Sequence, residues 1–361
     1  MQQTTRTVLV TGGMGFIGSA LVLHLRKHRP QWRVINFDAL TYAGNVENLL
    51  SLRDDPLHTF IHGDITDPDA VASVFEQHTI DAVFHLAAES HVDRSIVSPL
   101  EFVRTNVEGT VVLLRAATKA WKGRQDARFI HVSTDEVFGE LGPEGFFTET
   151  TPYAPRSPYA ASKACSDHMA RSWAATYGLP VIVTNCTNNY GPRQFPEKLL
   201  PVVITRAVDG DPVPVYGNGQ NVRDWLYVDD HCAALLKVME EGAPDETYCI
   251  GGQAEVSNIE MVQRLLDEVD RQLERPVGTS RALIRFVTDR PGHDFRYAMD
   301  ISHIQKTLGW SPSVGLDDGL KHTVRWYLDN NPWLQNVTSG AHRDFQRIWY
   351  GERLAAADGP S

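Results

Sequence analysis

The sequence is poor in the residue patterns that build metal sites and disulfide scaffolds. Its 361 residues include only four cysteines, and no two of them form a Cys-x-x-Cys pair. Two of the spacings among the 14 histidines read His-x-x-x-His, at 24–28 and 58–62, but neither has a cysteine or a further histidine close by in the sequence to complete a ligand set. We therefore expect buried free thiols in a reducing compartment, no disulfide framework and no bound metal.

Long apolar runs and an excess of positive charge are also missing. The N-terminus is a short polar lead into Val8-Leu9-Val10, which is too brief for a signal peptide or a membrane span. The formal net charge of −11 argues against a general nucleic-acid surface, although local basic pockets for phosphates are still compatible with it. These absences favour a cytoplasmic protein with no nucleic-acid or membrane partner.

Short apolar runs alternate with amphipathic stretches through the first half of the chain. The runs at 7–11, 33–37, 59–62, 82–86, 129–133 and 181–184 are typical of strands, and 17–28, 69–78, 101–119 and 158–177 are typical of helices. This alternation predicts an α/β protein with a Rossmann-type, doubly wound parallel sheet.

After about residue 190 proline and glycine cluster, and helical patterns recur at 259–273 and 316–328. We expect residues 1–190 to form the parallel-sheet domain, which 225–250 would rejoin through a strand-like run at 246–250. Residues 191–361 would then form mainly a smaller, loop-rich α/β lobe.

A strand, a Gly-rich turn and a helix start follow one another near the N-terminus. Gly12 permits the tight turn, Gly15 lets the backbone approach a pyrophosphate, and Gly18 allows close helix–sheet packing. About twenty residues later stands Asp38, placed to accept hydrogen bonds from a ribose and to repel a 2′-phosphate. The pattern predicts NAD rather than NADP; a tight turn without a ligand is the alternative.

Two residues at other expected strand ends are ambiguous. Asp64 is equally a hydrogen-bond acceptor for an adenine amino group and a cap for the helix that follows Pro68. His85 is more typical of a hydrogen-bonded core histidine than of a catalyst.

Tyr159 and Lys163 lie four residues apart near the start of the expected helix 158–177, on one face. An ammonium beside a tyrosine favours the phenolate by lowering its pKa from about 10. Such a phenolate removes a hydroxyl proton while hydride leaves the same carbon for a nicotinamide. An ordinary amphipathic helix is the alternative.

Thr134, Asp135 and Glu136 follow the expected strand that precedes this helix, where an open α/β sheet places its chemistry. The Thr134 hydroxyl suits the substrate oxygen that the tyrosine would serve. Two adjacent carboxyl groups can have separated pKa values, one protonated as an acid and one ionised as a base. A solvated turn is the alternative.

Over most of its length the sequence resembles the extended short-chain dehydrogenases/reductases, and among them the dTDP-glucose 4,6-dehydratases. The segments that carry this resemblance are 11–18, 38–45, 85–95, 133–139, 159–163, 188–192, 195–199, 223–225 and 289–294. The Asp-Glu pair and Asp-Arg-Pro-Gly-His at 289–293 are far more specific than the glycines. Phe138 departs from the family pattern, which usually has tyrosine there.

The resemblance implies a complete catalytic cycle on a nucleotide sugar. Tyr159, helped by Thr134 and Lys163, deprotonates the sugar 4-hydroxyl as carbon 4 gives hydride to NAD. Glu136 then removes the carbon 5 proton, Asp135 protonates the departing 6-hydroxyl, and hydride returns to carbon 6. A homodimer is also implied, with helices 101–119 and 158–177 as the candidate interface.

The resemblance further implies which residues bind the ligands. Those for NAD are Gly12, Gly15, Phe16, Ile17, Gly18, Asp38, Leu40, Thr41, Asp64, Ile65, Leu86, Ala87, Ala88, Ser90, Thr105, Tyr159, Lys163 and Asn189. Those for the sugar nucleotide are Ser90, Thr134, Asn188, Lys198, Leu199, Pro214, Tyr216, Arg223, Asn258, Arg290 and His293. The two arginines suit a diphosphate, with ordinary surface arginines as the alternative.

Three other functions share parts of this pattern. UDP-glucose 4,6-dehydratases have the same core motifs. Nucleotide-sugar 4-epimerases and decarboxylases share the cofactor turn and Tyr-x-x-x-Lys but have no use for the Asp-Glu pair. A non-catalytic, NAD-sensing binding protein would need neither Tyr159 nor Lys163, and both are present.

Overall fold

The computed structural model describes residues 5–124, 126–289 and 292–337. Its largest sheet has seven strands, all parallel, in the order β3-β2-β1-β4-β5-β6-β10. The strands are β1 (Thr7–Thr11), β2 (Arg33–Asp38), β3 (His58–His62), β4 (Ala82–His85), β5 (Arg128–Thr134), β6 (Val181–Cys186) and β10 (Thr247–Ile250). The order reverses between β1 and β4, so the predicted doubly wound fold is confirmed.

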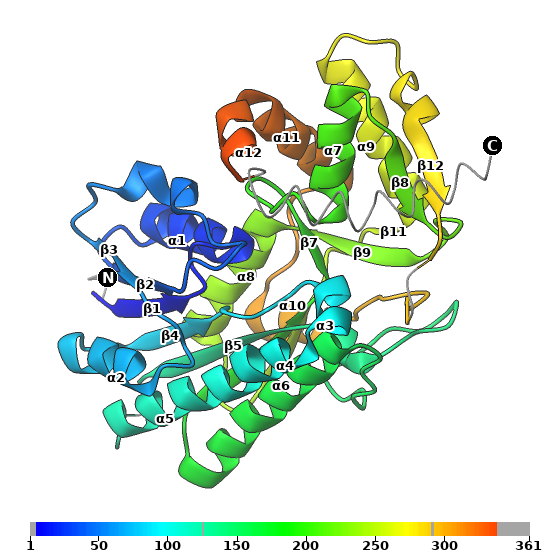
Figure 1. The fold of residues 1–361 in the computed structure, drawn as a ribbon. Helices are drawn as coiled ribbons and strands as arrows, with labels where there is room; N and C mark the ends of the chain where they lie inside the picture. Colours follow the sequence, from blue (N-terminus) through cyan, green and yellow to red (C-terminus); the bar gives the residue numbers. More distant parts are fainter. Residues whose placement is uncertain (1–4, 125, 290–291, 338–361) are drawn as a thin grey trace.

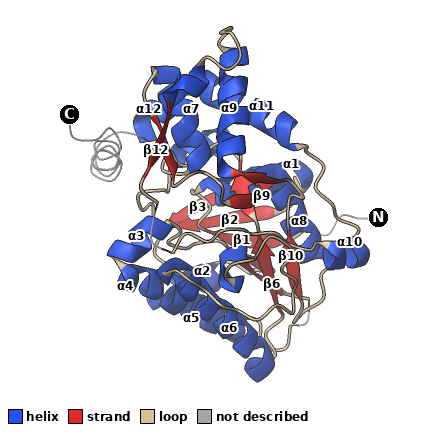
Figure 2. Ribbon diagram, turned by 90° about the vertical axis from the view of Figure 1, so that its right-hand side faces the viewer, coloured by secondary structure: helices blue, strands red, loops and turns tan. Residues whose placement is uncertain are grey.

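Helices cover both faces of this sheet (Figures 1 and 2). One face carries α2 (Pro68–Gln77), α5 (Thr110–Ala120) and α6 (Pro158–Tyr177), whose apolar residues share a core with the strands. The other carries α1 (Phe16–His28), α8 (Val228–Glu241) and α10 (Ser302–Leu308). Every residue of β4 and β6 is buried, as expected for parallel strands covered on both sides.

The smaller lobe is built around two short sheets (Figure 1). One has the order β11-β9-β7, and the other pairs β8 with β12. Its elements are β7 (Asn188–Tyr190), β8 (Val213–Tyr216), β9 (Val222–Tyr227), β11 (Glu255–Ser257), β12 (Ile284–Val287), α7 (Leu199–Asp209), α9 (Asn258–Gln272), α11 (Leu316–Asp329) and α12 (Asn331–Val337). Each part of the chain also has a short 3-10 helix. η1 (Val46–Leu52) lies between β2 and β3 of the large sheet, and η4 (Ser280–Leu283) precedes β12 of the smaller lobe.

The chain returns from the smaller lobe to the large sheet. β10 pairs in parallel with β6, with Thr247 opposite Val183, and α8 packs on α1. Residues 225–227 do not take part in this return, because they belong to β9 in the three-stranded sheet.

The segment expected as one helix at 101–119 contains a change of helical register. It comprises α4 (Pro99–Phe102), the π-helical η2 (Val103–Gly109) and α5, and a separate helix α3 (Val92–Val97) precedes it. The Thr110 hydroxyl donates to the Asn106 carbonyl at 2.6 Å. A π-helical turn has no clear signature in apolar periodicity, and such turns are frequent at functional sites.

None of the helices in the described part of the chain combines the length and apolar composition that crossing a bilayer requires.

Candidate active site

A cavity of about 330 Å³ lies at the carboxyl ends of the large-sheet strands, where the fold places ligands. All five predicted catalytic residues line it, as does every predicted NAD residue except Leu40. Segment 186–198, which leads into the smaller lobe, closes its other side. One cavity therefore brings the Gly-rich turn and the acid–base residues together.

The turn between β1 and α1 packs closely against its surroundings only because Gly12 and Gly18 lack side chains. Gly12 has a φ of +71°, and a Cβ there would lie 2.7 Å from the Ala87 backbone nitrogen. A Cβ at Gly18 would lie 2.1 Å from the Gly12 carbonyl oxygen. α1 begins at Phe16, and its N-cap Gly15 offers no side-chain cap to the first N–H groups. This cradle fits the pyrophosphate of a dinucleotide.

Asp38 ends β2 beside this turn. Its two carboxylate oxygens accept from the Met14 N–H at 2.9 Å and the Leu40 N–H at 2.8 Å, which fix the carboxylate at the cavity wall. The Leu40 side chain does not line the cavity and packs on the core instead. Leu40 contributes only its backbone N–H, which holds the Asp38 carboxylate. Asp64 does line the cavity, and the cap of α2 is Asp67, so the capping alternative for Asp64 is wrong.

Small residues at the end of β4 and one residue of the π-helical turn form the next part of the wall. Leu86, Ala87, Ala88, Ser90 and Thr105 all line the cavity. His85 lies behind them, fully buried, with its ring nitrogens 2.8 Å from the Thr11 hydroxyl and 2.9 Å from that of Thr110. The interpretation of His85 as a hydrogen-bonded core histidine is confirmed.

Thr134, Asp135 and Glu136 stand where β5 passes into the 3-10 turn η3 (Asp135–Phe138). The Thr134 hydroxyl donates to Asp135 Oδ1 at 3.1 Å and accepts from the Glu136 N–H at 3.3 Å. Asp135 is 2% exposed, and burial, followed by the charge of Glu136, raises its pKa well above the ordinary value. Glu136 is only half-buried. Asp135 is thus the carboxyl group that keeps its proton.

The environment of Tyr159 differs from the sequence-based expectation. Burial, followed by the charge of Glu136, raises the pKa of Tyr159 well above its ordinary value, and a hydrogen bond with Thr134 opposes this shift. The Lys163 ammonium donates to the Val132 carbonyl at 2.8 Å. The expectation that the pKa of Tyr159 lies below its ordinary value is therefore wrong, because loss of solvent around the phenol dominates.

The predicted substrate residues divide between the cavity and the lobe beyond it. Ser90, Thr134, Asn188 and Lys198 line the cavity, and the Lys198 ammonium donates to the Ser90 carbonyl at 2.9 Å. Leu199, Pro214, Tyr216, Arg223, Asn258 and His293 lie in the smaller lobe and do not line it. Arg290 lies outside the described residues.

Arg223 is not a surface arginine. It is 4% exposed, donates to the Asp294 carbonyl at 2.9 Å, and places its guanidinium 4.2 Å from the centre of the Tyr297 ring. Its charge also opposes the upward shift in the pKa of Asp135. Arg223 is therefore built into the wall behind the acid–base pair.

Sequence reasoning missed a polar cluster that joins the two lobes at the cavity. The Tyr42 hydroxyl donates to Glu197 Oε1 at 3.0 Å, and the Arg94 guanidinium lies 3.7 Å from the centre of the Tyr42 ring and 3.4 Å from Glu197 Oε2. Tyr42 and Glu197 are 155 positions apart, so no local pattern signals their contact. Other cavity residues that were not predicted include Glu89, Ser133, Cys186, Thr187 and Gln194.

Similarity to known proteins agrees with this geometry. The family described as GDP-mannose 4,6 dehydratase matches residues 9–323. The chain belongs to this family. Within the family, the dTDP-glucose 4,6-dehydratase of Neisseria meningitidis serogroup B is 54% identical over 358 residues, covering 96% of this chain and 100% of that protein. The dTDP-glucose 4,6-dehydratase 1 of Escherichia coli K12 is 51% identical, covering 94% and 97%.

Solved structures include members with closely similar folds. A dTDP-glucose 4,6-dehydratase of Streptomyces venezuelae, solved with NAD bound, has a TM-score of 0.84 and 46% identity, and the match covers 92% of this chain and 99% of that one. A Thermotoga maritima UDP-glucose 4-epimerase, solved with UDP-glucose, has a TM-score of 0.78 and 32% identity, with coverage of 90% and 99%. The fold is thus shared with epimerases and does not distinguish a dehydratase from an epimerase. The feature that distinguishes them has to be the Asp135–Glu136 turn.

Proposed function

We propose that this protein is a dTDP-glucose 4,6-dehydratase that uses NAD and converts dTDP-glucose to dTDP-4-keto-6-deoxyglucose and water. The observation that carries the proposal is the turn after β5, where buried Asp135 keeps its proton beside half-buried Glu136. This turn shares one cavity with Tyr159, Lys163 and the glycine cradle. A dehydrogenase or epimerase would need the cradle and the Tyr–Lys pair but not the two carboxyl groups.

Three cavity residues, Tyr159, Glu136 and Asp135, each carry a proton transfer. Tyr159 accepts the proton of the sugar 4-hydroxyl, with the Thr134 hydroxyl positioning that oxygen and Lys163 adding positive charge. When bound, NAD supplies a hydride acceptor for carbon 4, a hydride for carbon 6 and a positive charge that favours the phenolate. Glu136 removes the proton at carbon 5, which the new ketone acidifies, and a proton returns to carbon 5 from the same side chain once hydride has been added at carbon 6. Asp135 gives its proton to the departing 6-hydroxyl, so water leaves.

We assign NAD to residues 1–190, which 228–250 rejoin at α8 and β10, and the nucleotide part of the substrate mainly to residues 191–361. Ser90, Asn188 and Lys198 contact the sugar end from the cavity wall. The smaller-lobe residues hold the nucleotide: Leu199, Pro214, Tyr216, Arg223, Asn258, Arg290 and His293. In support, the Tyr216 and His293 rings lie 6.2 Å apart, edge to face.

The proposal is tested with dTDP-glucose that carries deuterium at sugar carbon 4. After incubation with the protein and catalytic NAD, mass spectrometry should show loss of water with the deuterium recovered at carbon 6. Turnover of UDP-glucose but not dTDP-glucose would change the nucleobase assignment. Inertness toward both would contradict a dehydratase and favour a 4-epimerase, a decarboxylase or an NAD-sensing binding protein.

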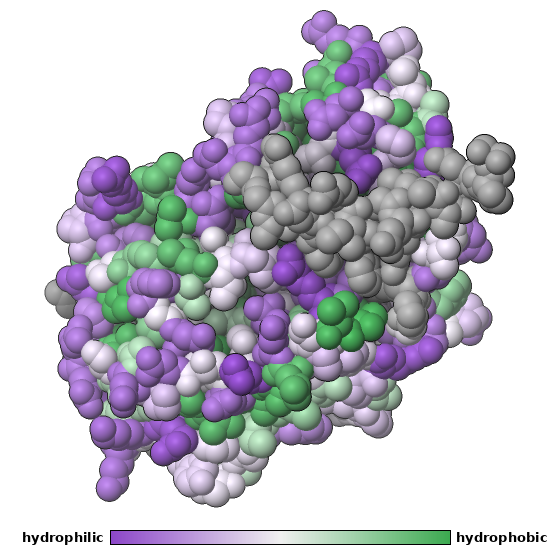
Figure 3. All heavy atoms as spheres, viewed as in Figure 1, coloured by the Kyte–Doolittle hydropathy of each residue, from purple (hydrophilic) through white to green (hydrophobic). Residues whose placement is uncertain are grey.

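We further propose a homodimer in the cytoplasm. Val97, Leu100 and Val103 are 67%, 80% and 50% exposed on the segment α3–η2, next to α6. Figure 3 shows hydrophobic residues at the surface where Figure 1 places α3 and α4. A second copy would cover these side chains. All four cysteines are free, which suits a reducing compartment; Cys186, Cys232 and Cys249 are buried as expected, whereas Cys165 is exposed, so the expectation of a buried thiol is wrong there.

A further inference from the structure

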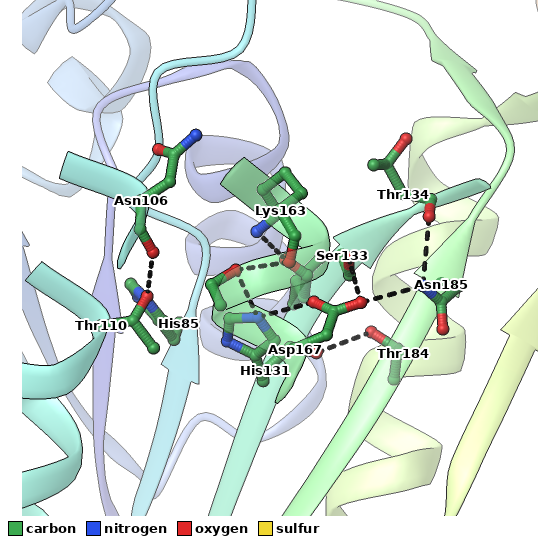
Figure 4. Close-up of polar contacts among 12 residues, drawn as sticks. His85, Asn106, Thr110, His131, Ser133, Thr134, Lys163, Asp167, Thr184 and Asn185 are labelled. Carbon is green, nitrogen blue, oxygen red and sulfur yellow. Dashed lines mark hydrogen bonds and ion pairs between the residues drawn. The ribbon is translucent and has the colours of Figure 1, made fainter. Parts of the chain in front are cut away.

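A buried carboxylate beneath the cavity takes no part in the proton transfers above. Asp167 lies on α6, one helical turn after Lys163, and is 0% exposed. Its oxygens accept hydrogen bonds from four side chains, which Figure 4 shows in part: His131 at 3.0 Å, Ser133 at 2.8 Å, Tyr153 at 2.8 Å and Asn185 at 3.4 Å. Four donors on one buried group form a rigid, charge-assisted network.

Two of these donors connect Asp167 to the catalytic turn. Ser133 directly precedes Thr134 on β5. The Asn185 amide on β6 donates to Asp167 and, at 3.1 Å, to the Thr134 carbonyl (Figure 4). Asp167 therefore holds the end of β5 from two sides, just before the backbone turns to carry Asp135 and Glu136.

Asp167 is also the negative charge that faces the catalytic lysine. Burial acts to raise the pKa of Asp167, but the hydrogen bond and charge of His131, the charge of Lys163 and the hydrogen bond of Tyr153 outweigh it, and the pKa lies below the ordinary value. Burial lowers the pKa of Lys163, and the charge of Asp167 opposes that shift. The Asp167 carboxylate thus favours the protonated form of Lys163, and the Lys163 ammonium favours the ionised form of Asp167.

The other titratable groups around this pair do not replace Asp167. Burial lowers the pKa of His85 on β4 well below its ordinary value, and burial lowers the pKa of His131 on β5, although the hydrogen bond and charge of Asp167 oppose that shift. Burial raises the pKa of Cys186 on β6 to about 12 and raises those of Tyr153 and Tyr159, so these groups stay protonated near neutral pH. Arg171 on α6 adds a positive charge near His131, and the negative charge of Glu136 acts on Tyr159.

We propose that Asp167 is a positioning residue of the dehydratase reaction, which holds the Thr134 end of β5 and supplies the negative charge that faces the Lys163 ammonium. This inference rests on the proposed function. Asp167 acts through Thr134 and Lys163 and does not touch the reacting atoms.

The test compares Asp167→Asn with the parent in single turnovers of dTDP-glucose, followed by the absorbance of reduced nicotinamide. The rate of the first oxidation should fall about tenfold to a hundredfold, the range expected when such a network loses its anion. The rate should also decline at a lower alkaline pH than in the parent, because the Lys163 ammonium loses its proton more easily without the anion. Asp167→Glu keeps a carboxylate at this position, so the alkaline pH at which the rate declines (the alkaline limit) should be that of the parent.

A second variant and a second readout separate the two roles. Asn185→Ala removes the link to Thr134 but leaves the charge, so it should slow the oxidation without moving the alkaline limit. Carbon-13 NMR of labelled lysines, assigned with Lys163→Met, should show a lower pKa of Lys163 in Asp167→Asn independently of turnover.

Parent-like rates and alkaline limits in Asp167→Asn would overturn the inference while the proposed function stands. If Asp167→Asn does not fold, an unchanged oxidation rate in Asn185→Ala would overturn the positioning role. A parent protein that does not oxidise dTDP-glucose would overturn both proposals.

Discussion

Asp135 and Glu136 are neighbours in the chain, yet the fold surrounds them differently. Both side chains line the cavity, but Asp135 is almost fully buried and its Oδ1 accepts from Thr134, whereas Glu136 is only half-buried. Loss of solvation disfavours a carboxylate, so the buried member keeps its proton and the other can act as base. The division of labour therefore follows from burial and not from residue type.

The protonated state of Asp135 should appear in the pH dependence of stability. Because its folded pKa lies above the unfolded value of about 3.9, the folded state binds more protons, and stability is lost as pH rises toward the folded pKa. Asn cannot ionise. The unfolding free energy of Asp135→Asn relative to the parent should therefore increase as the pH rises above about 4, by up to roughly 1.4 kcal/mol per pH unit.

Urea denaturation at several pH values measures this difference. Asp209→Asn, at an exposed aspartate of the smaller lobe, serves as the control and should leave the pH dependence unchanged. A constant difference between Asp135→Asn and the parent would contradict the buried, protonated state.

The roles of the cavity residues separate into two chemical steps. The double variant Asp135→Asn, Glu136→Gln should still reduce bound NAD with dTDP-glucose, but water loss should fall by about 100-fold or more, because acid and base are both removed. Tyr159→Phe should instead block the first oxidation while NAD still binds. Rapid-quench mass spectrometry with absorbance detection distinguishes the two. Normal dehydration by the double variant would refute the acid–base assignment.

At the scale of elements, the loop after β2 and the start of α7 meet across the cavity. Tyr42 comes from the loop and Glu197 from the segment before α7, and the T-shaped contact of Tyr42 with Phe195 adds to their hydrogen bond. Ala39, Thr41 and Gly44 of the same loop line the cavity. The loop is thus tied to the smaller lobe next to the proposed cofactor site.

Tyr42→Phe should loosen this connection, because the Glu197 carboxylate loses a donor while the ring contact stays. We expect NAD to dissociate about tenfold faster, which corresponds to one hydrogen bond to a charged group. Stopped-flow displacement of NADH, followed by its fluorescence, measures the rate. Tyr248→Phe, which removes a hydroxyl bonded to the Ala243 N–H outside the cavity, is the control and should dissociate at the parent rate. Equal rates for both variants would contradict the role of Tyr42.

At the scale of the whole molecule, the proposed dimer depends on one apolar surface. Leu100 and Val103 project from the segment beside α6. Leu100→Glu with Val103→Glu should place charges in the interface and convert the dimer to a folded monomer, which sedimentation velocity and circular dichroism detect. Phe286→Glu, at a residue 51% exposed on β12, should leave the assembly unchanged. A dimer that survives the double substitution would place the interface elsewhere.

Local sequence patterns are sufficient to predict most of the helices and strands that carry the site residues. The helix 158–177 was predicted with both ends correct, because Ser157 caps it, Pro158 starts it and Gly178 ends it in a left-handed conformation. The strand at 7–11 and the Gly-rich turn that follows it are predicted by equally local signals. Fold class and the identity of the candidate site residues follow from such signals together with the family resemblance.

The tertiary structure alone decided how those residues are arranged. The Tyr42–Glu197 contact, the enclosure of Arg223 and the π-helical turn at 103–109 leave no local trace in the sequence. The pKa of Tyr159 rises although a lysine stands four residues away, because burial outweighs a nearby charge. Periodicity and helix caps depend on adjacent residues, whereas solvation and long-range contacts depend on everything that packs around a group.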